Sequence, residues 1–225
     1  MAGGGCDPGA VDSYSGQGRG SKSHDWCART GRSFRNEKRR SRKLLTKPIP
    51  TGKEVHFGEE EIIVSKTDLR GVITYANDLF LRVSGYTESE VLGKPHSMIR
   101  HPDMPRVLFE MLWQRLQSGK EMFAYVKNMT KSGDHYWVLA HVTPTFDREG
   151  RISNYHSNRR WADREALRSI EPLYARLKSE EERHADRRQG MAAARALLER
   201  MLSEQRRSYD QFVFSLVDQG DHVHA

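Results

Sequence analysis

The sequence lacks the features that define several large classes of protein. Its 225 residues include only two cysteines, Cys6 and Cys27, both in a segment rich in Gly, Ser and Arg. They have no metal-ligand spacing and leave the predicted core without a disulfide, as is usual in a reducing cytoplasm. No stretch approaches the roughly 20 apolar residues that cross a bilayer, and the N-terminus lacks the apolar run of a signal peptide. We therefore expect a soluble, cytoplasmic chain without a transmembrane segment.

The motifs of common enzyme classes are also absent. The sequence contains no nucleophile elbow, no phosphate-binding glycine loop and no zinc-spaced set of Cys and His. His222 and His224 alone are too few to indicate a metal site. We expect a protein that is not an enzyme.

Positive charge is confined to one end of the chain. The formal net charge is +7; residues 1–55 hold 12 Lys and Arg against 5 Asp and Glu, and residues 56–225 hold 25 of each sign. The remaining 170 residues are therefore neutral overall, which argues against specific nucleic-acid binding there. Residues 1–47 have few aliphatics and predict a disordered basic tail, in which the run from Arg35 to Lys43 can touch nucleic acid or anionic lipid.

Hydrophobic patterning predicts a folded domain over residues 48–161. Strand-like runs lie at 62–64, 71–75, 122–128, 135–144 and 152–160. Between the second and third runs, Asn77 can cap a helix over 78–83, and Thr87-Glu88-Ser89-Glu90 is a capping box. A longer helix is expected from Pro102 to near Gly119. This order predicts an α+β fold with a five-stranded antiparallel sheet and helices over one face.

Residues 162–217 predict a helical extension, followed by a short tail over 218–225. Apolar residues recur at helical spacing from Leu167 to Leu177 and again from Met191 to Leu216. Pro172 is expected to kink or break the first helix, and Gly190 to weaken the second. The two apolar stripes should pack on the domain or mediate self-association, as in a homodimer.

The six residues Arg100-His101-Pro102-Asp103-Met104-Pro105 contain more than a helix start needs. Pro102 suits a first helical position, and Asp103 complements a helix dipole. Neither role accounts for the neighbouring Arg100, His101 and second proline. The surplus predicts a binding loop.

This order of elements, with these residues, resembles a PAS domain, and closely resembles the flavin-binding PAS module of bacterial aerotaxis receptors. The matching stretches cover roughly half of the chain. They are Thr67-Asp68-Leu69, Ile73-Thr74, Ala76-Asn77-Asp78, Val83-Ser84-Gly85-Tyr86-Thr87, Gly93, Pro95-His96, Arg100 to Pro105, Val126-Lys127-Asn128, Lys131, Gly133 to Val138, and Glu171-Pro172-Leu173-Tyr174.

The resemblance implies a sensor domain over 48–161 that holds FAD non-covalently and reports its redox state to a chemotaxis signalling partner. Arg100, His101 and Asp103 match the family motif needed for flavin binding, and Asn77 and Trp113 also stand at matching positions. Met122 stands where the family has a tryptophan. A thioether packs on a ring but does not replace an indole donor.

Physical chemistry gives these residues definite roles at a flavin. Arg100 offers a planar, permanent cation, which would favour the reduced, anionic form of the ring. His101 can donate a hydrogen bond, and His96 and Asp103 can orient the donors. The candidate apolar walls are Phe80, Trp113, Tyr125 and Tyr136.

Two alternatives remain open at the level of sequence. The histidines in and near the domain could instead provide an axial ligand for haem b. The substitution at Met122 also leaves room for a cofactor-free interaction module. Absorption spectra separate these possibilities, because haem gives a Soret band and flavin gives peaks in the blue.

Overall fold

The structure is a computed structural model that describes residues 47–221, and the side chains up to residue 217. Most of the predicted basic tail, with both cysteines and the run from Arg35 to Lys43, lies outside the described residues, as do residues 222–225. Among the helices within residues 47–221, none has both the length and the apolar character that a membrane crossing requires.

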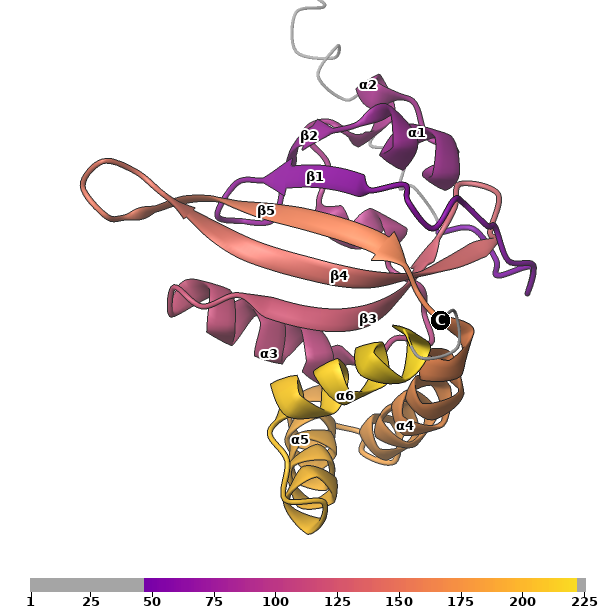
Figure 1. Ribbon diagram of the computed structural model, residues 1–225, viewed down its shortest axis with the longest axis vertical. Coiled ribbons are helices and arrows are strands. Elements are labelled where there is room, and N and C mark those ends of the chain that lie inside the picture. The colour runs from indigo at the N-terminus through magenta and orange to yellow at the C-terminus, as the bar shows by residue number, and fades with distance from the viewer. Residues whose placement is uncertain (1–46, 222–225) are drawn as a thin grey trace, which may run out of the picture. The chain divides into compact units, whose positions relative to one another are not determined.

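Five strands form one antiparallel sheet, as predicted. They are β1 (Ile63–Thr67), β2 (Ile73–Ala76), β3 (Met122–Met129), β4 (His135–Phe146) and β5 (Ile152–Trp161), in the order β2-β1-β5-β4-β3. β5 therefore lies in the centre, between β1 and β4 (Figure 1). Because side chains alternate between the two faces of a sheet, Tyr155, Ser157 and Arg159 of β5 share one face.

Four helical segments connect β2 to β3. They are α1 (Asp78–Ser84), α2 (Glu88–Val91), the 3-10 helix η2 (His96–Ile99) and α3 (Arg106–Gln117). Asn77 caps α1 by accepting a hydrogen bond from the Phe80 N–H, and Thr87 and Glu90 form the predicted capping box.

The longer helix begins later than predicted, at Arg106 rather than at Pro102. Pro105 disfavours helical backbone at Met104, the residue before it, so the helix cannot include Met104. Pro105 itself has extended backbone, with ψ of 143°, and is the N-cap, so the helix begins at Arg106. Residues 101–104 instead form a turn in which the Met104 N–H donates to the His101 carbonyl at 3.2 Å. Proline thus marks the helix start, but the second proline decides its position.

Three helices follow the sheet: α4 (Arg164–Glu182), α5 (Arg187–Glu204) and α6 (Tyr209–Asp221). The expected break at Pro172 does not occur, because α4 continues through it. An internal proline costs about 3 kcal/mol, but α4 buries a full apolar face, and each such side chain contributes about 1.5–3 kcal/mol. The buried apolar residues of α4 are Ala166, Leu167, Ile170, Leu173, Tyr174 and Leu177.

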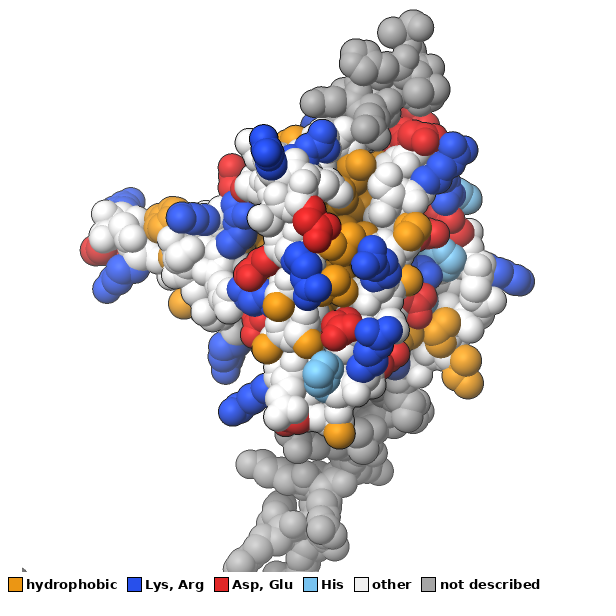
Figure 2. All heavy atoms as spheres, turned by 90° about the horizontal axis from the view of Figure 1, so that it is seen from below, with side chains coloured by type: hydrophobic (Ala, Val, Ile, Leu, Met, Phe, Trp, Pro, Cys, Tyr) orange, Lys and Arg blue, Asp and Glu red, His pale blue; other side chains and the backbone are white. Residues whose placement is uncertain are grey.

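Apolar side chains form two clusters around the sheet. One lies beneath α1, α2 and η2 and includes Phe80, Tyr136 and Val138. The other joins β3 and α3 to the three C-terminal helices, where the Tyr174 hydroxyl donates to the Tyr125 carbonyl at 2.8 Å. On the face seen in Figure 2, hydrophobic side chains lie in a furrow beside Lys and Arg side chains. Because this second cluster joins the C-terminal helices to β3 and α3, the helical extension packs on the domain, which was one of the two arrangements predicted for it.

Candidate functional site

A cavity of about 370 Å³ lies between the sheet and the connecting helices. One wall comes from α3, through Phe109, Leu112, Trp113 and Leu116, and the other from the sheet, through apolar residues that include Val126, Ala140 and Val142. Its volume falls within the roughly 300–1,000 Å³ typical of small-molecule sites.

Trp113 is held in this wall by two close neighbours. Its ring packs edge-to-face against Tyr155, with centroids 5.6 Å apart. On another side it lies against Gly71, where an added Cβ would stand 2.9 Å from the indole. Gly71 also has a φ of +77°, which side chains rarely adopt. Glycine at 71 therefore lets the indole approach the turn between β1 and β2.

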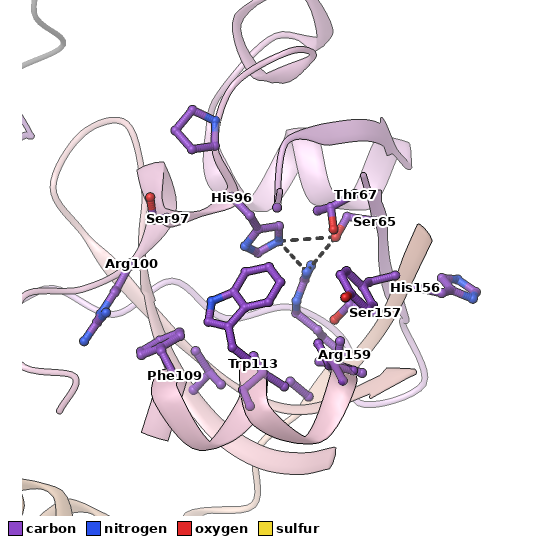
Figure 3. A pocket seen from close by; sticks show the side chains of 18 of the residues that line it. Ser65, Thr67, His96, Ser97, Arg100, Phe109, Trp113, His156, Ser157 and Arg159 are labelled. Carbon is purple, nitrogen blue, oxygen red and sulfur yellow. Dashed lines mark hydrogen bonds between the residues drawn. The ribbon is translucent and has the colours of Figure 1, made fainter. Parts of the chain in front are cut away.

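A buried polar cluster stands within the cavity (Figure 3). The Arg159 guanidinium donates to Ser65 Oγ at 2.6 Å and to His96 Nε2 at 2.6 Å, and only 3% of Arg159 is exposed. Burial, reinforced by the Arg159 charge, lowers the pKa of His96 to about 3. His96 is therefore neutral at pH 7, and its Nε2 is an acceptor.

Four buried polar atoms of cavity-lining residues have no hydrogen-bond partner among the described residues. They are Nη1 of Arg159, Nδ2 of Asn128, Oγ of Ser157 and Nε2 of His156, whose ring points away from the cavity in Figure 3. Buried donors are almost always paired in folded proteins, with the protein, with water or with a ligand. Two of these atoms can only donate, so the cavity suits a ligand that presents acceptor atoms along one edge and a flat apolar body to the walls.

Two of the six predicted site residues line the cavity, Arg100 and Trp113. The Arg100 guanidinium does not point toward the polar cluster; in Figure 3 it turns away from His96 and Arg159. It donates to the Met104 carbonyl at 3.0 Å and lies 3.8 Å from the Phe109 ring centroid. Arg100 is thus a residue at the edge of the cavity that also holds the turn before α3.

His101 and Asp103 lie outside the cavity lining. His101 is buried, with Nδ1 3.3 Å from the Asp103 carboxylate and its ring edge-to-face with His135. Asp103 also accepts from Lys127 Nζ at 2.8 Å. The pKa of His101 is lowered to about 4 by burial and by the Lys127 charge. These two residues fasten the turn before α3 to β3.

Asn77 and Met122 are also absent from the lining. Asn77 Oδ1 accepts from the Val64 and Phe80 N–H groups and its Nδ2 donates to the Ile62 carbonyl, so its polar atoms are occupied in joining β1 to α1. Met122 is buried in the cluster below α3 and pairs in register with Val142, which lines the cavity. Of the four predicted aromatic walls, Trp113 lines the cavity, whereas Phe80, Tyr125 and Tyr136 do not.

Sequence reasoning missed Arg159, Ser157 and Asn128. A signal was present for Arg159, because a charged residue alternates there with Tyr155 and Ser157 in a strand whose alternate positions face inward. For Ser157 and Asn128 only the assembled sheet shows the role. His96 was expected to orient donors, and it does accept a hydrogen bond from the buried arginine.

The sheet and its covering helices have the PAS fold, and residues 73–158 match the family model described as PAS fold. The chain is 45% identical over 134 residues to the aerotaxis receptor of Escherichia coli, covering 60% of this chain and 26% of the receptor. It is 34% identical over 86 residues to the biofilm dispersion protein BdlA of Pseudomonas aeruginosa, covering 38% and 21%. The chain thus spans about a quarter of the curated relatives it matches.

A third relative is the nitrogen fixation regulatory protein of Klebsiella pneumoniae, 28% identical over 97 residues, covering 43% of this chain and 20% of that protein. Among solved structures, a light-oxygen-voltage domain described with a flavin analogue matches with a TM-score of 0.44 and 24% identity. That match covers 55% of this chain and 87% of the solved one.

Proposed function

We propose that this PAS domain is a redox- or oxygen-linked sensor in the cytoplasm, that it holds a flavin in the cavity, and that it acts by signalling and not as an enzyme. The observation that carries the proposal is the set of unpaired buried donors facing an apolar cavity. The similarity to an aerotaxis receptor supports a sensing role, and the resemblance in the sequence supports FAD.

The cavity residues fit a flavin in two respects. Trp113, Leu112 and Val126 offer apolar surface to a flat ring. Asn128 Nδ2 and Arg159 Nη1 offer donors for ring acceptors. When bound, a flavin supplies a group that accepts and returns electrons, and the protein's part is to bind, orient and shield it.

We infer FAD, rather than a smaller flavin, from the cations at the edge of the cavity. Arg70 and Arg100 both belong to the lining. Arg100 is fixed by its contact with Phe109, whereas Arg70 is largely exposed and pairs with Asp68. Guanidinium groups suit phosphate oxygens, so these two can receive the pyrophosphate that FAD carries beyond its ring.

The haem alternative has less support from the geometry. Two histidines line the cavity, His96 and His156. His96 Nε2 is already the acceptor for Arg159, and His156 points away from the cavity in Figure 3. Neither presents a free nitrogen to the cavity as an axial ligand would. In a cofactor-free module, water would have to pair the buried polar atoms of Arg159, Asn128 and Ser157.

We propose that α3 carries the signal outward, because it contacts both the cavity and the extension. The apolar side of α3 lines the cavity, and the opposite side contacts all three C-terminal helices. Glu110 pairs with Arg195 of α5 at 2.8 Å, and Arg115 makes a bidentate pair with Asp210 of α6 at 2.9 and 2.6 Å. A shift of α3 of a few tenths of an ångström at the cavity would therefore reach the extension.

For the partner we propose a separate chemotaxis-type signalling protein with an acidic helical segment. A groove between α4, α5 and α6 has apolar residues such as Leu202 and Phe212 in its lining, together with Arg168, Arg176 and Arg207 and no acidic residue. Arg176 forms no ion pair within residues 47–221, and Arg207 donates to a serine. The groove is thus complementary to an apolar helix face flanked by carboxylates.

The test is an absorption spectrum of the purified full chain, before and after addition of FAD. We expect flavin peaks in the blue. Asn128→Ala and Ser157→Ala should each weaken FAD binding about 5- to 10-fold, because a hydrogen bond contributes roughly 1 kcal/mol. Asn158→Ala is the matched control, since Asn158 lies beside Ser157 but does not line the cavity. A protein that stays colourless with added FAD would overturn the proposal. A Soret band would show that the cavity binds haem and not flavin.

A further inference from the structure

The strongest unexplained feature of the molecule is the charge of Arg159. Two partly buried arginines at the packed helices have acidic partners: Arg115 pairs with Asp210, and Arg195 pairs with Glu110. Arg159 is more deeply buried than either, yet no carboxylate within residues 47–221 forms an ion pair with it. Its recorded side-chain partners, Ser65 Oγ and His96 Nε2, are both neutral.

A buried cation without a counter-charge is costly. Taking an ion out of water costs several kcal/mol even after relaxation, and hydrogen bonds to neutral groups recover only part of this. Burial lowers the pKa of Arg159 to about 10, so the group is still charged at neutral pH. The domain therefore keeps a full positive charge beside its cavity, and Nη1 is left without a partner.

The charge is also held in place. Arg159 stands on the central strand β5, paired with Ile63 on one side and Ala140 on the other. Its guanidinium lies 5.7 Å from the Phe80 ring centroid and is anchored by two hydrogen bonds. A cation fixed in this way acts on a ligand without first having to move, which is the condition for strong electrostatic selection.

We propose that Arg159 makes the cavity selective for the form of its ligand that carries negative charge on the buried edge. This inference rests on the proposed function and deepens it: for a flavin, the selected form is the reduced anion. The cation that tunes the redox equilibrium is thus Arg159, and not Arg100, for which the sequence suggested this role.

The other groups near the cavity cannot replace this charge. Arg100 is committed to the Met104 carbonyl and the Phe109 ring, and its guanidinium turns away from the polar cluster in Figure 3, so its charge does not face the buried edge. His96 is neutral at pH 7 because its pKa is about 3. The Tyr136 hydroxyl is neutral as well, because burial raises its pKa. Arg70 lies at the exposed edge of the cavity and pairs with Asp68, so solvent and this carboxylate both weaken its effect on a buried ligand.

The first measurement uses the unaltered full chain with FAD. Wild-type uptake of FAD tests the proposed function alone. If FAD binds, the reduced flavin should show the spectrum of its anion at pH 7, and protonation should require a pH at least one unit lower than for free reduced flavin. A neutral reduced flavin at pH 7 would overturn the inference while leaving the proposed function intact.

The second measurement compares Arg159→Gln and Arg159→Lys with the control Arg160→Gln, whose side chain is exposed and does not line the cavity. In R159Q the ratio of affinities for reduced and oxidised FAD should fall at least tenfold, which equals about 30 mV for a two-electron couple. R159K keeps the charge and should retain most of the ratio. If the ratio of affinities is unchanged in R159Q, the inference is overturned. If R159Q does not fold, R159K decides: a tenfold loss of the ratio in this variant, which keeps the charge, also overturns the inference.

Discussion

Glu181 of α4 accepts a hydrogen bond from the backbone N–H of Val107 at 2.8 Å, within the buried interior. Val107 lies in the first turn of α3, where N–H groups lack partners inside the helix. A side chain 74 positions away along the sequence thus caps the helix that walls the cavity. The C-terminal extension is part of the support of the site.

Removing this cap should weaken the fold. Glu181→Ala leaves a buried N–H unpaired, which costs about 1–3 kcal/mol, whereas Glu181→Gln retains an acceptor and should cost less. Urea unfolding measures both, and Glu182→Ala, at an exposed position, serves as control. An E181A protein as stable as the wild type would show that water replaces the carboxylate.

Trp113 should contribute more to flavin affinity than any other wall residue. Trp113→Ala removes a large aromatic surface from the cavity, and burial of such a side chain is worth about 1.5–3 kcal/mol. We expect FAD affinity to fall roughly 10- to 100-fold in a titration followed by flavin fluorescence. Trp161→Ala, outside the lining, should leave affinity unchanged; equal losses in both variants would point to general unfolding.

Met122 should matter for stability rather than for cofactor content. Because it is fully buried but does not line the cavity, Met122→Ala should cost about 2–5 kcal/mol without changing the FAD bound per folded molecule. Met122→Trp, which restores the residue expected in the family, should overpack the site and cost about 1–3 kcal/mol. Thermal unfolding and cofactor extraction provide the two readouts, and higher FAD content in M122W would contradict this expectation.

The stability of the fold should decrease as the pH falls below 6.5, the pKa of histidine in the unfolded chain. Burial lowers the pKa of His96 to about 3 and that of His101 to about 4, from 6.5 in the unfolded chain. The unfolded state therefore binds more protons between these values, and its protonation favours unfolding. We expect the free energy of unfolding to be constant above pH 6.5 and to fall between pH 6.5 and 4. His96→Gln should flatten this slope, and a rise on acidification would contradict the assignment.

The groove between the C-terminal helices should prefer acidic ligands. A labelled amphipathic peptide with Leu on one face and Glu on the other should bind, and its affinity should fall at high salt. Arg176→Glu with Arg207→Glu should weaken binding at least tenfold by fluorescence anisotropy, while Arg188→Glu on α5, outside the groove, should not. Equal binding of a Leu–Lys peptide, or a homodimer closed by this groove in light scattering, would refute the proposed partner.

The fold was predictable because its local signals agree with one another. Asn77 and Thr87 cap helices in the structure as their positions predicted, and the predicted strand run 135–144 contributes Tyr136 and Val138 to the buried cluster. The misplaced helix start involves proline, because Pro105 keeps Met104 out of the helix. At Pro172 a kink or a break was expected, and the helix does not break because tertiary burial outweighs the loss of a helix bond.

The site was less predictable than the fold. Arg100 and Trp113 line the cavity, whereas His101, Asp103 and Asn77 use their polar atoms on neighbouring backbone and side chains. The buried donors of Arg159 and Asn128 come from β5 and β3, which lie on either side of β4. Their convergence depends on strand order and register, which periodicity along one segment does not specify.

Gly190 fixes how the extension can move. An added Cβ at this position would stand 2.4 Å from the Glu181 carbonyl oxygen, so the start of α5 touches the end of α4 backbone to backbone. Such a close backbone contact leaves little room for α4 and α5 to move independently where they meet. A displacement of the Glu181 end of α4 should therefore also displace the start of α5.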